Sequence, residues 1–135
     1  MTQKNTNHLP PEQASNLPIK IDTEYVWVRR KDEITWLLNK RQTTPENPPF
    51  HVVIPAPTLE ELLALLPKYI IENNGIDYSL IIEYRNKKEG YRVKFEAYDK
   101  LILKTTDNKD PKQAVDMMLH WLDENDYLKE LTNTK

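Results

Sequence analysis

Two runs of residues in the middle of the chain alternate between apolar and polar side chains. The first run extends from Tyr78 to Tyr84 and the second from Tyr91 to Tyr98, and the sequence Asn-Lys-Lys-Glu-Gly lies between them at 86–90. Successive side chains of a strand point to opposite faces, so this pattern predicts an antiparallel hairpin with one buried and one solvated face. The chain must therefore supply elements that cover the buried face.

A short amphipathic helix is predicted after residue 57. Thr58 and Glu61 have the spacing of a capping box, in which each residue bonds to the backbone N–H of the other. Pro67 disfavours helical geometry at the residue before it, so the helix is expected to be short. Its apolar face consists of leucines at helical spacing, namely Leu59, Leu62, Leu63 and Leu66.

A second amphipathic helix is predicted near the end of the sequence. Asp110 is its N-cap, Pro111 suits the first helical position, and Gln113 is expected to complete a capping box. Asn125 can end the helix in a left-handed conformation. Tyr127 and Leu128 are then expected to fold back onto the core, beside a broad apolar face made by Ala114, Val115, Met118, Leu119, Trp121 and Leu122.

Further strands are predicted on both sides of these elements. Tyr25–Arg30 and Ile34–Leu38 are rich in β-branched and aromatic residues, with a turn between them, although a helix over residues 32–40 is the alternative. Phe50–Ile54 is a candidate strand within the proline-rich stretch 42–57, where the prolines exclude a central position in a sheet. Leu101–Leu103 continues the sheet after the hairpin.

These elements predict an α+β fold, in which an antiparallel sheet of about four to six strands carries two amphipathic helices on one face. We expect a flexible leader over residues 1–20, a single domain over 21–128 and a tail over 129–135, and 135 residues suit one domain. The predicted core consists of large apolar residues: Trp27, Trp36, Leu59, Leu62, Leu63, Leu66, Leu80, Ile82, Val93, Phe95, Val115, Met118, Leu119 and Leu122.

Composition excludes several kinds of site. The chain has no cysteine, so disulfides, thiolate catalysis and cysteine zinc sites are absent, and its two glycines cannot form a glycine-rich phosphate loop. The three histidines, His8, His51 and His120, lack the spacing of a helical metal pair. No cofactor, metal site or catalytic residue is therefore predicted. The first residues lack the apolar core of a signal peptide and no apolar run could span a bilayer, which favours a cytoplasmic protein without membrane contact.

Charge is unevenly distributed along the chain, although the formal net charge is only -2. The hairpins are basic and the last helix is acidic, with Asp116, Asp123, Glu124 and Asp126. A basic sheet face beside an aromatic side chain can bind nucleic acid by phosphate contact and stacking, whereas the simpler interpretation is an ordinary solvated face. The candidate partner-binding or nucleic-acid-binding residues on this face are Arg85, Lys87, Lys88, Arg92, Lys94 and Tyr98.

Three pieces of the sequence, taken together, resemble a family of small, largely uncharacterised proteins of prophages and other mobile elements of gut-type bacteria. The likeness covers about residues 25 to 128. It rests on the order of YVWV at 25–28 and WLL at 36–38, APTLEEL at 56–62 and LP at 66–67, and the apolar positions from Ala114 to Leu128. The resemblance implies a fold pattern and a habitat, and it carries over no functional residue.

The sequence leaves three functional hypotheses. The first is a non-enzymatic accessory protein of a phage or mobile element that binds another macromolecule, such as a protein. The second is nucleic-acid binding through the basic sheet face. The third is an enzyme, which would need a polar pocket with a group such as His120 beside a carboxylate. The oligomeric state stays open, because the sequence does not identify which strand forms a sheet edge.

Overall fold

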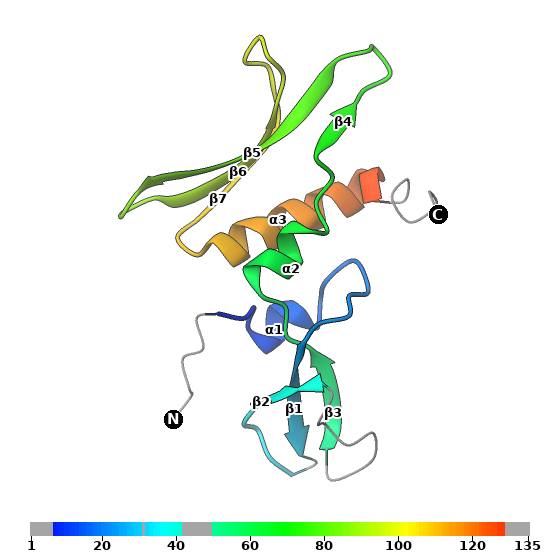
Figure 1. Ribbon diagram of the computed structural model, residues 1–135, viewed down its shortest axis with the longest axis vertical. Helices are drawn as coiled ribbons and strands as arrows, with labels where there is room; N and C mark the ends of the chain where they lie inside the picture. The colour runs from blue at the N-terminus through cyan, green and yellow to red at the C-terminus, as the bar shows by residue number, and fades with distance from the viewer. Residues whose placement is uncertain (1–6, 31, 42–49, 129–135) are drawn as a thin grey trace. The chain divides into compact units, whose positions relative to one another are not determined.

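The computed structural model describes residues 7–30, 32–41 and 50–128 (Figure 1). The α+β class is confirmed, but the strands form two antiparallel sheets, of three and four strands, rather than one. The chain divides into two compact units, residues 1–61 and residues 62–135. The predicted tail 129–135, residues 42–49 of the proline-rich stretch and Lys31 lie outside the described residues.

Unit 1 contains the three-stranded sheet, in which the strand order is β2-β1-β3. The edge position of β3 agrees with the expectation from its prolines. The alternative of a helix over residues 32–40 is wrong, because β2 pairs with β1 there, and Ile34 lies before the strand with 90% of its surface exposed. The strands are β1 (Tyr25–Arg30), β2 (Leu37–Lys40) and β3 (Phe50–Pro55).

The leader predicted for residues 1–20 contains, within its described part, a short helix and buried side chains. Helix α1 (Pro11–Ala14) contacts β3, and Leu9 is fully buried. The indole Nε1 of Trp27 donates a 2.8 Å hydrogen bond to the carbonyl oxygen of Leu9, and the N–H of Leu9 donates to the carbonyl of Pro57. The ring of His8 packs edge-on against Tyr25. These residues therefore pack as part of unit 1.

Helix α2 (Leu59–Leu63) is short, as Pro67 predicts. Its capping box is present: the N–H of Glu61 donates to Thr58 Oγ1, and the N–H of Thr58 donates to Glu61 Oε1. Leu62 is fully buried, whereas Leu59 and Leu63 are half-buried.

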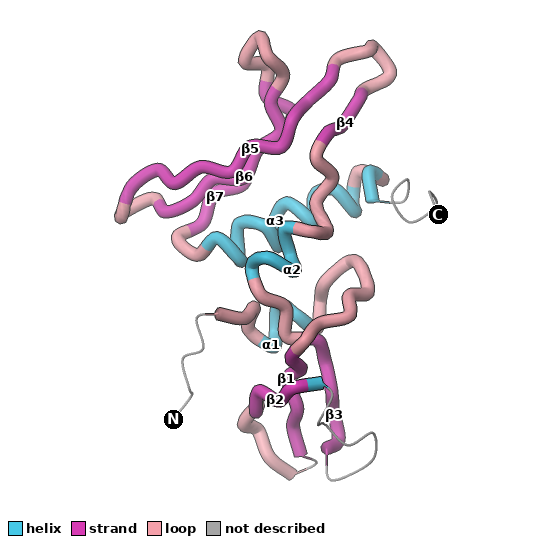
Figure 2. The backbone as a smooth tube through the Cα atoms, in the orientation of Figure 1, coloured by secondary structure: helices cyan, strands magenta, loops and turns pink. Residues whose placement is uncertain are grey.

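Unit 2 contains a four-stranded sheet in which each strand pairs with its neighbour in the sequence (Figure 2). The predicted hairpin is confirmed, with Leu80 opposite Phe95 and Ile82 opposite Val93. The turn at Asn73–Gly75 joins β5 to a short edge strand that the sequence pattern did not predict. The strands are β4 (Tyr69–Ile71), β5 (Asp77–Asn86), β6 (Gly90–Glu96) and β7 (Ile102–Asn108).

Helix α3 (Pro111–Glu124) packs on β6 and β7. Asp110 is its N-cap, as predicted, and its carboxylate accepts from the N–H of Lys112. In the predicted capping box, the side chain of Gln113 would accept from the N–H of Asp110. In the structure this N–H donates to Asn108 Oδ1 instead. At the other end Asp126, with φ 67°, takes the left-handed conformation predicted for Asn125.

The last described residues fold back onto unit 2, as predicted. Leu128 is buried, and the ring of Tyr127 stacks on Trp121 at 5.4 Å. The hydroxyl of Tyr127 donates a 2.6 Å hydrogen bond to a carboxylate oxygen of Glu72. These contacts hold the end of α3 against the segment that follows β4.

The core prediction is confirmed for most of the hairpin and helix residues. Val93 and Phe95 on β6 are fully buried beneath α3, and Met118 and Leu119 of α3 are fully buried as well. The prediction is wrong for Ile82, which shares the face of Val93 but is 40% exposed. Since α3 packs on β6 and β7, the face of β5 near the hairpin turn lacks the cover that the alternation implied. The packing of α2 on this sheet stays a prediction.

Candidate interaction surface

The sheet face opposite α3 carries charged side chains that pair with one another. The guanidinium of Arg92 donates two hydrogen bonds to Asp107, of 2.8 and 3.1 Å, and Asp107 is its register partner on β7. The Lys94 ammonium lies 3.4 Å from Glu83 and 3.0 Å from Glu96. These contacts make the predicted basic face electrically mixed, because each cation of β6 has a carboxylate neighbour.

The hydrogen bond from Arg92 lowers the pKa of Asp107 below its ordinary value, and burial opposes it. The same pairing raises the pKa of Arg92. A depressed carboxyl pKa contributes stability above the unfolded-state pKa, and this contribution is lost as the pH falls through the folded-state value. Because Asp107 is 43% exposed, solvent screens the pair and its contribution is small.

The six candidate residues do not come together at one place. Arg85, Lys87 and Lys88 lie at the turn between β5 and β6, whereas Tyr98 lies in the turn after β6, at the opposite end of that strand. β6 has seven residues, so its ends are about 20 Å apart. Tyr98 is fully exposed, but it is too far from the turn lysines to share a ligand site with them.

A different aromatic residue lies beside the turn lysines. Tyr84 is 57% exposed and contacts Tyr91 edge-on at 5.2 Å. The register partner of Tyr91 on β7 is Asn108, whose Nδ2 lies 3.9 Å from the sulfur of Met117. The exposed side chains of Ile82, Tyr84 and Met117 and the half-buried ring of Tyr91 form an apolar group on the α3 side of the sheet. We call this group the tip surface, and its apolar members are Ile82, Tyr84, Tyr91 and Met117.

Three lysines border the tip surface. Lys87 and Lys88 lie in the β5–β6 turn, and Lys109 follows β7 at the same end of the sheet. A Cβ placed on Gly90 would be 2.3 Å from the Cα of Lys109, which shows how closely that residue approaches the turn. All three lysines are exposed, and within the described part of the chain no carboxylate pairs with them. Arg85, by contrast, lies 3.5 Å from Glu89.

A histidine beside a carboxylate, one of the features that the enzyme hypothesis requires, is present on α3. His120 Nε2 lies 3.3 Å from Oδ1 of Asp116, one helical turn away. Burial raises the pKa of Asp116, and the neighbouring His120 opposes this shift. The pair is thus a half-exposed imidazole beside a buried carboxyl.

Asp116→Asn is expected to flatten the pH dependence of stability. A raised carboxyl pKa means that the folded state binds the proton more tightly, so the free energy of unfolding falls as the pH rises from the unfolded-state pKa through the folded-state value. Urea unfolding at a series of pH values measures this slope. Asp123→Asn, which changes an exposed acid of the same helix, should keep the slope of the unchanged protein. Equal slopes for both variants would contradict the role of Asp116.

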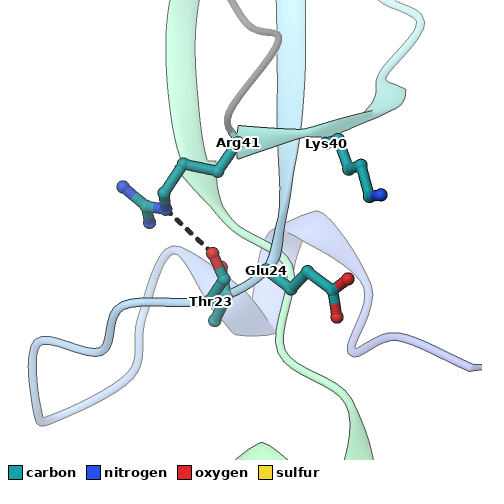
Figure 3. Close-up of a pocket in the computed structure, with 4 residues that line it drawn as sticks. All are labelled: Thr23, Glu24, Lys40 and Arg41. Carbon is teal, nitrogen blue, oxygen red and sulfur yellow. Dashed lines mark hydrogen bonds between the residues drawn. The ribbon is translucent and has the colours of Figure 1, made fainter.

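A small pocket lies in unit 1, with a volume of about 240 Å³ and with Thr23, Glu24, Lys40 and Arg41 around it (Figure 3). Two of the lining residues form hydrogen bonds within unit 1. Arg41 Nε donates a 2.8 Å hydrogen bond to the carbonyl of Thr23, and the Thr23 hydroxyl donates to the carbonyl of Tyr25. Thr23 and Arg41 therefore have structural roles beside β1 and β2.

Within residues 7–30, 32–41 and 50–128, no group of three His, Asp or Glu side chains is placed to hold a metal ion, and no helix is long and apolar enough to cross a membrane. Comparisons with protein-family models, with curated proteins and with solved structures gave no match to this chain.

Proposed function

We propose that this protein is a non-enzymatic binding protein and that its tip surface is the contact site for another protein. The observation that carries the proposal is the exposure of Ile82 and Tyr84 on the core-facing side of a sheet. Exposed apolar groups bordered by polar residues mark interaction sites, and tyrosine is enriched among the residues that dominate binding energy. The resemblance to proteins of prophages adds the proposal of an accessory role in a mobile element. A cytoplasmic location, which the sequence pattern favours, is part of the same proposal.

The ion pairs on the sheet face opposite α3 disfavour nucleic-acid binding at that face. Arg92 and Lys94 would have to leave Asp107, Glu83 and Glu96 before they could neutralise phosphates. The carboxylates would also repel a polyanion, because they carry charge of the same sign as its phosphates.

Site-specific photo-crosslinking tests the proposed contact. A benzoylphenylalanine in place of Tyr84 is expected to give a discrete crosslinked protein in cells that naturally contain this chain. The same residue in place of Tyr98 is the matched control, because Tyr98 is equally aromatic and lies at the other end of β6. Crosslinks of equal yield at both positions, or none at position 84, would overturn the proposal.

Nucleic-acid binding is the second candidate function, and the observation in its favour is the group of Lys87, Lys88 and Lys109 beside Tyr84. Three phosphate contacts to a single strand predict a slope of log affinity against log salt of about −2. Fluorescence anisotropy with labelled oligonucleotides at low and moderate salt measures this slope. No binding at low salt would eliminate this candidate.

A further inference from the structure

The tip surface combines two kinds of contact group in a fixed arrangement. Its apolar part crosses the sheet from Tyr84 on β5 to Tyr91 on β6, and Met117 of α3 adjoins Asn108, the register partner of Tyr91 on β7. Its basic part is the β5–β6 turn, at the left of Figure 1, together with Lys109. Apolar side chains thus lie in the centre and lysines lie at one border.

The half-covered sheet determines what shape of ligand suits the apolar part. α3 packs on β6 and β7, and on β5 the same face leaves Ile82 40% and Tyr84 57% exposed. Met117, 43% exposed, lies beside Asn108 at the β7 end of the tip surface. A helix or an extended segment laid across this end of the sheet, from β5 to α3, would bury Ile82, Tyr84 and Met117 together.

The charges determine the chemistry of that ligand. Lys87, Lys88 and Lys109 are exposed and have no carboxylate partner in the described part of the chain, so carboxylates of a ligand could reach all three. A nucleic acid fits the centre less well, because Ile82 and Met117 offer no stacking ring and Tyr84 already has Tyr91 against it. Charge complementarity together with apolar anchors favours a peptide.

We infer that the tip surface binds an acidic amphipathic segment of a partner protein. Two or three apolar side chains of the segment would cover Ile82, Tyr84 and Met117, and its carboxylates would lie beside Lys87, Lys88 and Lys109. This inference rests on the proposed function and adds the chemical class of the partner. Lysines at the border of an interface mainly set the association rate and its salt dependence. A tyrosine that becomes buried when the partner binds mainly sets the affinity.

The probe is a fluorescent peptide of about 16 residues, or four helical turns, with leucines at i, i+3, i+4 and i+7 and glutamates elsewhere. We expect the full-length protein to bind it with a Kd of about 10 μM, which corresponds to about 7 kcal/mol. A peptide with lysines in place of the glutamates should bind at least about tenfold weaker. Anisotropy titrations at two salt concentrations measure both effects.

Two variants test the residues, and circular dichroism checks that each is folded. Tyr84→Ser should weaken binding about tenfold at any salt concentration, whereas the triple change of Lys87, Lys88 and Lys109 to glutamine should remove most of the salt dependence. Tyr98→Ser is the matched control and should keep the affinity of the unchanged protein. Equal binding of the acidic and basic peptides would overturn the inference, as would Tyr84→Ser with unchanged affinity.

Other results distinguish the inference from the proposed function. If oligo-dT binds more tightly than the acidic peptide, or if ultracentrifugation shows a dimer that Tyr84→Ser dissociates, the ligand class is wrong. If a crosslink forms at position 84 but the acidic peptide does not bind, the partner is a protein of different chemistry, so the inference fails and the proposed function survives. If no crosslink forms at position 84 and the acidic peptide does not bind, both the proposed function and the inference fail.

Discussion

Replacing Phe95 with alanine is expected to lower the free energy of unfolding by about 3–5 kcal/mol. The side chain of Phe95 is fully buried near the end of β6, opposite Leu80 on β5 and on the face that α3 covers. Its removal would take away apolar burial and leave a cavity that a strand paired on both sides cannot collapse to fill. Urea unfolding, followed by circular dichroism, measures the loss.

Tyr98→Ala is the control for this change. Tyr98 is also aromatic and follows β6 closely in the sequence, but it is fully exposed, so its replacement should change stability by less than about 0.5 kcal/mol. A loss for Phe95→Ala no larger than that for Tyr98→Ala would mean that β6 does not carry the core of unit 2.

Gly90→Ala is expected to have the second largest effect, a loss of about 2–5 kcal/mol. Gly90 has φ +79°, a conformation that costs an L-residue about 1–2 kcal/mol. A Cβ there would also lie 2.3 Å from the Cα of Lys109 and 2.5 Å from the carbonyl oxygen of Asn108, so backbone must move, at a further cost of about 1–3 kcal/mol. Thermal and urea unfolding measure the sum.

Gly75→Ala separates the two contributions. Gly75 also has a positive φ, of +86°, but nothing lies within 4 Å of a Cβ placed there. Gly75→Ala should therefore lower the free energy of unfolding only by the part that comes from backbone conformation. Equal losses at both glycines would show that the β5–β6 turn does not press against Lys109, which would weaken the geometry of the tip surface.

The features that the sequence predicted are those set by residues near one another in the chain. The register of Leu80 with Phe95 follows from alternation and one turn, and the caps at Thr58 and Asp110 follow from spacings of a few residues. Such features need no knowledge of distant partners. The shortened β2 and the three-residue β4 were less accessible, because in short strands the pairing partner decides the bounds more than composition does.

The division into two sheets could not be predicted from local pattern. It depends on which strands pair, and β1 pairs with β3, which lies within the proline-rich stretch, rather than with any strand of the hairpin. The carbonyl of Leu9 accepts from Trp27, a contact between segments with no shared periodicity. Proline-bearing polar residues before Tyr25 therefore gave no indication of this packing.

The candidate site was predicted only in part. The turn cations Lys87 and Lys88 were identified, but Tyr84 was assigned to the apolar, inward side, because alternation tells which face a side chain is on and not how far a helix covers that face. α3 has 14 residues and packs on two of the four strands. Comparing its length with the number of predicted strands would have indicated that part of the apolar face stays open.

The connectivity of the two units implies different folding speeds. In unit 2 every strand pairs with the next one in the chain, so only short loops must close before contacts form. In unit 1, by contrast, residue 8 bridges to residue 58 and Leu9 bonds to Pro57, which joins segments far apart in the chain. Because long-range closure slows folding, the meander of unit 2 should form first, and the buried indole of Trp27 should report the slower phase.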